Sequence, residues 1–291
     1  MSKATIWPYL QLMRPANLVT ANADILAGFA AAGQPGFGRL LWLLLATTGI
    51  YGGGIVYNDV FDAELDAAER PERPIPSGGV SLRRASLLGS VLLLIGICAA
   101  FLVSPVSGCI AALTAVCALL YDARTKHHPF LGPLNMGGCR GLNLMLGVSA
   151  APEMLGQRWY LALIPILYIA AITAISAGEV HGGKRTTGLL ALGLLGAVLL
   201  AVPALSLTPQ FRLLPLLPFL FLLAGRVLPP FWQAYLRPQP CDLRVAVKAG
   251  VLSLIVLDAA MAAGYAGLLY GLAVLALTFA AAWLAKLFAV T

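Results

Sequence analysis

Long apolar runs recur along the whole chain and constrain its fold more than any other feature. They cover roughly residues 17–32, 40–58, 83–103, 106–121, 134–150, 160–177, 188–207, 211–228, 246–264 and 267–289. A membrane-spanning helix needs about 20 mostly apolar residues. Within lipid, only helices and closed barrels provide partners for all backbone hydrogen-bonding groups. With 60% hydrophobic and 11% charged residues, too little charge remains to cover a soluble globule. The sequence therefore predicts an all-α, polytopic transmembrane helical bundle.

The positive charges are distributed unevenly between the loops. Of 19 Lys and Arg residues, three lie in the loops of one side, namely Arg39, Arg158 and Arg212, and most of the others lie in loops of the opposite side. Loops rich in Lys and Arg stay in the cytoplasm. We therefore expect a multi-pass integral membrane protein whose N-terminus and residues 58–78 face the cytoplasm. Because the net charge of +7 follows the membrane topology, it does not indicate a nucleic-acid partner.

Acidic and amide side chains gather directly after the second apolar run, in the segment NDVFDAELDAAERPERPIPSG. On a helix that continues at about 100° per residue, four of them fall within about 100° of one another. These four are Asn58, Asp59, Asp62 and Asp66, whereas Glu64 falls on the other side. Carboxylate and amide oxygens suit Mg²⁺, so we predict a metal site with Asn58, Asp62 and Asp66 as ligands and Asp59 in support. The alternative is an acidic helix end in water, with its acids paired by Arg70 and Arg73.

The spacing of these residues, followed by Arg73-Pro74-Ile75-Pro76-Ser77-Gly78, resembles the first aspartate-rich motif of the UbiA superfamily of intramembrane prenyltransferases. The resemblance implies a single UbiA-like domain over residues 1–291 with nine transmembrane helices, whereas the apolar runs number ten. It also implies a Mg²⁺-dependent transferase that moves a polyprenyl group from a polyprenyl diphosphate donor in the membrane lipid to a small-molecule acceptor. The sequence does not identify the acceptor, for which an aromatic compound is one option.

The polar segment after the sixth run departs from the superfamily pattern. Superfamily members have a second aspartate-rich motif there, often D-x-E-G-D-R, whereas this chain reads E-V-H-G-G-K-R from residue 179. Glu179 takes the first Asp position, His181 the Glu position and Gly183 the last Asp position. We expect Glu179 to be a catalytic metal ligand, but a site with so few carboxylates would hold a second Mg²⁺ weakly or not at all. Lys184 and Arg185 keep the basic end of the motif.

Further candidates come from other segments. The resemblance implies that a Tyr and a Lys end the fourth run, where this chain has Tyr121 and Lys126, five residues apart instead of the usual four. Arg140 lies within an apolar run, so it either faces a polar cavity or snorkels to the interface. We expect the diphosphate to be bound by Arg73, Lys126, Arg140, Lys184 and Arg185. We expect the substrate pocket to include Asn17, Asp24, Tyr57, Tyr121 and His181, with interhelical hydrogen bonding as the alternative role for Asp24.

Two other function classes stay open at this point. One is different chemistry on the same fold, such as terpene cyclisation or transfer to a non-aromatic acceptor. The other is a non-catalytic binder or carrier of an isoprenoid or lipid phosphate. The complete first motif favours prenyl transfer, because a binder would not need all of its acids. The degenerate second motif is what keeps the alternatives open.

Overall fold

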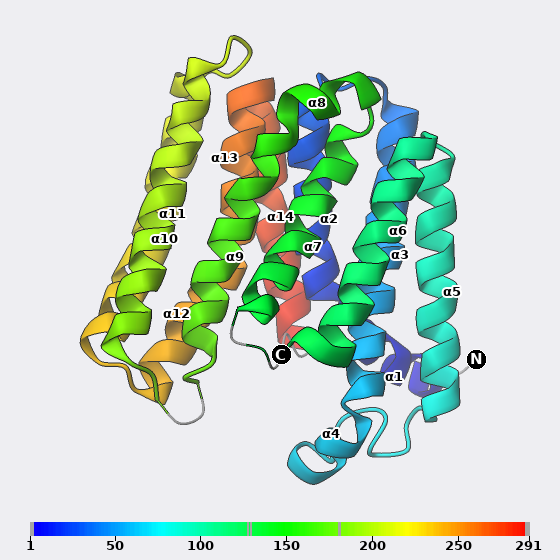
Figure 1. The fold of residues 1–291 in the computed structure, drawn as a ribbon. Helices are drawn as coiled ribbons and strands as arrows, with labels where there is room; N and C mark the ends of the chain where they lie inside the picture. The colour runs from blue at the N-terminus through cyan, green and yellow to red at the C-terminus, as the bar shows by residue number, and fades with distance from the viewer. Residues whose placement is uncertain (1–2, 127, 129, 180–181, 289–291) are drawn as a thin grey trace.

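A computed structural model describes residues 3–126, 128, 130–179 and 182–288, and in this part of the chain the regular structure is helical, without strands (Figure 1). The helices are α1 (Lys3–Met13), α2 (Pro15–Ala31), α3 (Phe37–Phe61), α4 (Ala63–Glu69), α5 (Leu82–Phe101), α6 (Pro105–Leu120), η1 (Tyr121–Thr125), α7 (Leu131–Val148), η2 (Pro152–Met154), α8 (Leu155–Arg158), η3 (Trp159–Ala162), α9 (Leu163–Ser176), α10 (Arg185–Ala204), η4 (Leu205–Leu207), α11 (Leu213–Leu236), α12 (Pro240–Leu252), α13 (Leu254–Ala266) and α14 (Leu268–Leu287).

The long helices run side by side along one axis, and both chain ends lie at the lower end of the bundle in Figure 1. Among the described residues, eight helical segments are long and apolar enough to cross a membrane. α2 and α7 are shorter, with 17 and 18 residues, and they run between the others. The expected all-α, multi-pass membrane bundle is thus confirmed. Whether nine or ten segments cross the bilayer stays a prediction.

α2 and α7 pack closely because glycines face one another where they cross. A Cβ atom on Gly28 would lie 2.2 Å from the carbonyl oxygen of Leu144, and one on Gly147 would lie 2.5 Å from that of Ile25. Small residues let membrane helices approach in this way. The close contact brings the polar side chains of both helices together in the interior of the bundle.

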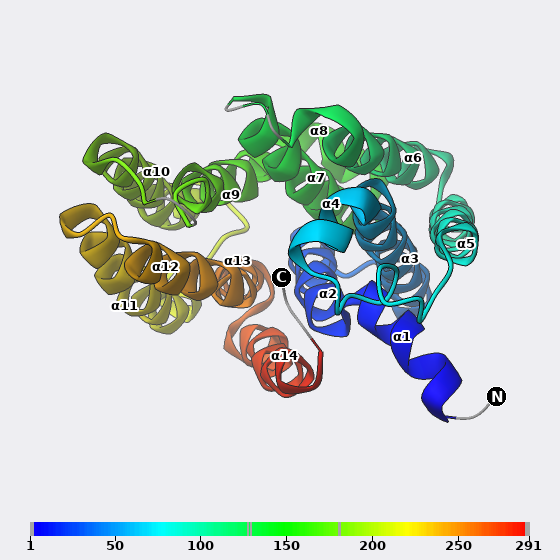
Figure 2. The same ribbon diagram turned by 90° about the horizontal axis from the view of Figure 1, so that it is seen from below.

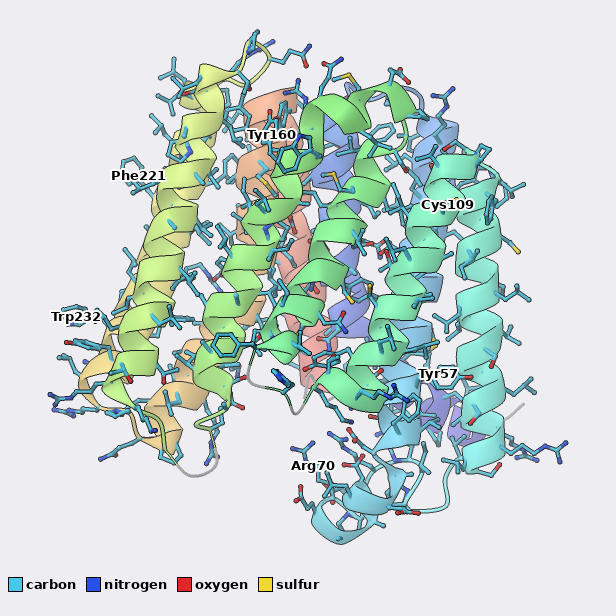
Figure 3. The ribbon with its side chains drawn as sticks, viewed as in Figure 1. Tyr57, Arg70, Cys109, Tyr160, Phe221 and Trp232 are labelled. Atoms are coloured by element: carbon cyan, nitrogen blue, oxygen red, sulfur yellow. The ribbon has the colours of Figure 1, made fainter. Side chains whose placement is uncertain are left out.

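Large apolar side chains cover the outside of the bundle. Phe221 and Trp232 project outward from α11 in Figure 3, and they are 72% and 53% exposed. Lipid tails are as apolar as these side chains, so the outer face suits contact with a bilayer.

The acidic segment differs from the expected continuous helix. α3 ends at Phe61 and α4 begins at Ala63, so that prediction was wrong at Asp62, whose backbone angles are φ −91° and ψ 4°. The i to i+4 hydrogen bonds nevertheless continue, from Asp62 N to Asn58 O at 3.0 Å and from Asp66 N to Asp62 O at 2.8 Å. The shared face therefore survives the interruption, and Glu64 is exposed as expected.

The apolar run 246–264 also differs from a single helix. α12 and α13 meet at Ser253, whose backbone N–H is shared between the carbonyl oxygens of Ala249 and Gly250 at 3.0 and 3.1 Å. Arg226 Nε donates to the Ser253 hydroxyl at 3.2 Å. This polar contact from α11 accompanies the break. No proline and no pair of glycines marks the break in the sequence.

Candidate active site

Two arginines meet the acids of the first motif at the lower end of the bundle. Arg73 bridges two of them, with its Nη1 2.7 Å from Asp66 Oδ2 and 3.6 Å from Asp59 Oδ1. Arg14, at the junction of α1 and α2, places its Nη2 2.5 Å from the same Asp59 oxygen. These side chains are only 5–13% exposed, so water screens their charges weakly. Sequence reasoning anticipated Arg73 and missed Arg14.

The segment after α6 supplies two more partners. Lys126 Nζ donates to Asp62 Oδ1, and the Asn58 Nδ2 amide donates to Asp122 Oδ1 at 2.9 Å. The four polar residues of the motif therefore each have a partner from another part of the chain or from the loop that follows α4. Sequence reasoning proposed Lys126 but gave no role to Asp122, which is 6% exposed.

The turn that carries these partners is a π-helical turn, η1. The Lys126 N–H donates to the Tyr121 carbonyl oxygen at 3.0 Å, an i to i+5 bond. A turn closed in this way takes up one residue more than an α-helical turn. It accounts for the five-residue spacing between Tyr121 and Lys126, because the extra residue is absorbed while Lys126 still reaches Asp62. Asn135 of α7 holds the turn from the other side by donating to Thr125 Oγ1 at 2.9 Å.

Figure 1 and Figure 2 show α4 beneath the lower end of the bundle, below α3. Arg70, labelled at this end in Figure 3, is exposed. Of the two arginines that the sequence offered as partners of the acids, Arg73 is the one seen to pair with them. The loop Arg73–Gly78 folds back under the motif, with Ser77 N donating to Arg73 O at 3.0 Å and Val80 N donating to Pro74 O at 2.9 Å.

The expected pocket residues near this end are placed as follows. Tyr57 is half-buried, and its hydroxyl shares a 2.7 Å hydrogen bond with Ser90 of α5. Tyr121 is half-buried at the start of η1. Asn17 lies in the first turn of α2, where its carbonyl oxygen accepts a 2.8 Å bond from Thr20 Oγ1. Their roles toward a substrate stay predictions.

The second polar segment lies on another part of the lower face, beside α12 and away from α4 in both Figure 1 and Figure 2. Gly183 N donates to Pro238 O at 2.9 Å, and Arg185 Nη2 donates to Leu236 O at 3.3 Å. Lys184 is exposed. These contacts attach the segment to the turn between α11 and α12 instead of to the first motif. His181 lies outside the described residues.

Glu179 is half-buried in the turn that follows α9. Burial raises the pKa of its carboxyl, and the positive charge of Arg244 lowers that pKa in part. Glu179 thus lies near Arg244 of α12, and the structure does not bring it to Asn58, Asp62 and Asp66. Its role as a metal ligand stays a prediction.

Arg140 and Asp24 pair with each other in the interior of the bundle. Arg140 Nη1 donates to Asp24 Oδ2 at 2.8 Å, and Nη2 donates to Thr20 Oγ1 at 2.6 Å. The guanidinium also lies over the Tyr51 ring, 5.2 Å from its centroid. Arg140 is 8% and Asp24 1% exposed. Arg140 contacts α2 and α3 instead of the acidic motif. The pairing gives Asp24 the interhelical hydrogen bonding that the sequence offered as its alternative role.

Two further helices join this interior network. Asn143 of α7 donates to the same Asp24 oxygen at 2.8 Å, and Thr47 of α3 donates to Asn143 Oδ1 at 2.6 Å. The Asp258 carboxyl of α13 lies beside that of Asp24. The Asp258 Oδ2 oxygen is buried without a hydrogen-bond partner among the described residues. We call the set Asp24, Arg140, Asn143, Thr47 and Asp258 the interior network.

The first motif offers one amide oxygen and three carboxylates as possible metal donors. Within the described ranges, no three His, Cys, Asp or Glu side chains converge closely enough to hold a metal ion. Asp59, Asp62 and Asp66 instead face Arg14, Arg73 and Lys126. The carboxylate oxygens of these acids are the donors that a hard cation takes. The donor set fits Mg²⁺ once the acids exchange their present partners.

Membrane-length helices with an acidic motif and three half-buried cations at one end define a multi-pass membrane protein with a cluster of opposite charges at that end. A model of the UbiA prenyltransferase family matches residues 22–243. The chain belongs to this family, so it is a prenyltransferase. The match includes the acidic motif, η1, α7 and the second polar segment.

Curated and solved relatives agree with this assignment. The chain is 30% identical over 227 residues to the digeranylgeranylglyceryl phosphate synthase of Ignicoccus hospitalis, which covers 70% of this chain and 75% of that protein. The structure of a UbiA homologue from Aeropyrum pernix K1 matches with a TM-score of 0.70 at 18% identity, covering 85% of this chain and 97% of that chain. A UbiA homologue from Archaeoglobus fulgidus bound to GPP and Mg²⁺ matches with a TM-score of 0.63 at 16% identity, covering 92% of this chain and 99% of that chain.

Proposed function

We propose that this chain transfers a prenyl group from a prenyl diphosphate to a lipid-soluble acceptor, with Mg²⁺ held at the first motif. The observation that carries the proposal is the set of paired charges at the lower end of the bundle. Arg14, Arg73 and Lys126 are gathered there against Asp59, Asp62 and Asp66. A site that binds a metal diphosphate needs both kinds of charge, because the acids hold the metal and the cations hold the phosphate oxygens.

Binding would proceed by an exchange of partners. Asp62 and Asp66 would hold Mg²⁺ together with the Asn58 amide oxygen, with Asp59 in support, and the cations released from the acids would contact the diphosphate. Mg²⁺ would act as a Lewis acid that neutralises the charge of the departing diphosphate. Arg73 and Lys126 already contact the acids, so the cations and the acids of this exchange are gathered at one place. Glu179 remains a candidate ligand of a second ion, and Lys184 and Arg185 remain candidate phosphate contacts there.

The reaction breaks the bond between the prenyl C1 atom and the diphosphate oxygen, and the electron pair leaves with the diphosphate. The acceptor then forms a bond to C1 and gives up a proton. The prenyl tail lies among the helices, where the exclusion of water protects an allylic cation from hydrolysis. Two aromatic groups would face that cation. Tyr57 directly precedes the motif in the chain, and Tyr121 begins η1, the turn that contacts the motif.

The relatives narrow the choice of acceptor. The synthase of Ignicoccus hospitalis is named for a glyceryl phosphate that carries two geranylgeranyl groups. We therefore propose a prenylated glyceryl phosphate as the first acceptor to test and an aromatic acceptor as the second. Cyclisation of the donor, or binding without cleavage, would be revealed by the same assay.

The experiment compares diphosphate release by purified wild-type protein, Asp62→Ala and the matched control Glu64→Ala. Prenyl diphosphates of several chain lengths are tested with and without Mg²⁺ and with each acceptor. We expect Mg²⁺-dependent release by the wild type and by Glu64→Ala, because the Glu64 side chain is exposed off the shared face. Asp62→Ala should release diphosphate about 100-fold or more slowly than the wild type, because the loss of one key electrostatic group has an effect of this size on turnover. Equal turnover in all three proteins would refute the site.

A further inference from the structure

Asp122 is a buried carboxylate that no part of the proposed reaction uses. It is 6% exposed and lies in the first turn of η1, and its Oδ1 accepts the Asn58 Nδ2 amide at 2.9 Å. Asn58 comes from α3, 64 residues earlier in the chain. A buried carboxylate that contacts one amide of the motif either supports that amide or takes part in binding the metal itself.

The direction of this bond decides what Asn58 can do. A carboxamide group carries its NH₂ and its carbonyl oxygen on opposite sides of the same carbon, so fixing one fixes the other. Because the NH₂ of Asn58 is held by Asp122, its carbonyl oxygen faces away from Asp122. Without such a partner the amide could rotate and present NH₂, which cannot bind a metal. Partners of this kind set the orientation of metal ligands.

The π turn explains why Asp122 is available for this purpose. Its first residue, Tyr121, directly follows α6, and its C-terminal end is held twice, by the Lys126 contact to Asp62 and by the Asn135 bond to Thr125. Asp122 thus sits on a turn whose position is set by α3 and α7 together. A free surface loop would not hold a carboxylate against one particular amide.

We propose that Asp122 is a positioning residue that orients the Asn58 amide oxygen for the metal of the first motif. The proposal rests on the proposed function for the existence of that metal site. It assigns Asp122 no contact with metal or substrate: it acts only through Asn58. Its two consequences are that any acceptor of similar shape at residue 122 should suffice, and that residue 122 should not matter once Asn58 is gone.

Mn²⁺ binding without turnover tests both consequences. Free Mn²⁺ is measured by electron paramagnetic resonance in titrations of detergent-purified protein, with and without inorganic pyrophosphate. Asp122→Ala should weaken Mn²⁺ binding about 10-fold or more, the range found for lost partners of metal ligands. Asp122→Asn should stay within about 3-fold of the wild type, because its carbonyl oxygen can still accept the Asn58 amide. Arg124→Ala, an exposed change in the same turn, is the matched control.

A double-variant cycle separates positioning from direct binding. In an Asn58→Ala background, Asp122→Ala should cause no further loss of Mn²⁺ affinity. The proposal is overturned if the loss persists in that background, if Asp122→Asn loses as much as Asp122→Ala, or if the wild type binds no Mn²⁺. The folded state of each variant is checked by its thermal unfolding.

Failure of the proposed function gives a different pattern. Wild-type protein that binds Mn²⁺ with the expected dependence on residue 122, yet releases no diphosphate with any donor and acceptor, would refute prenyl transfer and leave the role of Asp122 standing. Wild-type protein that releases diphosphate while Asp122→Ala binds Mn²⁺ as tightly as the wild type would refute the role of Asp122 alone.

Discussion

Replacing Arg140 by methionine should strongly destabilise the protein. Met has similar length and no charge, so the change leaves Asp24 at 1% exposure without its 2.8 Å ion pair. Loss of one partner of a buried ion pair costs about 3–5 kcal/mol. The remaining partners of Asp24 are the neutral amide of Asn143 and the carboxyl of Asp258, neither of which brings a positive charge.

The assay is thermal unfolding in detergent, followed by loss of helical signal and by aggregation. For large domains, 1 kcal/mol shifts Tm by about 2–4 °C, so Arg140→Met should lower Tm by about 6 °C or more. The double variant Asp24→Leu with Arg140→Met should recover most of this loss, because an apolar pair of similar volume often replaces a buried ion pair without cost.

The same variants decide between two roles for Arg140. If Arg140 served mainly to bind diphosphate, Arg140→Met would keep the wild-type Tm and lose affinity for pyrophosphate, and Asp24→Leu would not compensate. A Tm within about 2 °C of the wild type would therefore refute the structural role derived from the interior network.

Two further predictions concern Asp258 and the orientation of the bundle. Asp258→Asn should leave Tm within about 2 °C of the wild type, because an amide has nearly the same size as the carboxyl and its NH₂ group can donate to the neighbouring Asp24 carboxylate; a fall in Tm as large as that of Arg140→Met would refute this expectation. In a variant without the native cysteines, Glu72→Cys should react with an impermeant maleimide only in inside-out vesicles and Gln157→Cys only in intact cells, since positive loops face the cytoplasm; the reverse labelling would refute a cytoplasmic site.

The positions of the membrane helices could be predicted because their signal is local. Each apolar run contains its own evidence for a helix, and every one of the ten runs lies on helical structure in the described part of the chain. The shared face of the acidic motif was predictable for the same reason, since Asn58, Asp62 and Asp66 are related by i to i+4 hydrogen bonds. The interruption at Asp62 was not, because no proline or glycine marks it.

Most pairings between distant segments could not be predicted, because they depend on which helices become neighbours, whereas Arg73 follows the motif closely in the chain and was anticipated. Arg14 and Asp59 are 45 residues apart, and Arg140 and Asp24 are 116 apart. The sequence shows Arg140 only as a cation within an apolar run. Such a cation is compatible both with a diphosphate ligand and with a buried ion pair. The five-residue spacing between Tyr121 and Lys126 was a visible signal for η1, but only the structure shows that the turn absorbs the additional residue.

The interior network also affects how the chain is made. The ribosome releases α2 with Asp24 long before Arg140 has been synthesised, and Asp258 of α13 follows later still. An ionised aspartate at the centre of a spanning helix costs about 2.5–3.5 kcal/mol on the scale of the insertion machinery. On that scale Asp24 disfavours the insertion of α2 alone, and α2 gains the buried ion pair that compensates for this cost only when Arg140 of α7 arrives. Its insertion is completed by a helix that does not yet exist when α2 first meets the membrane.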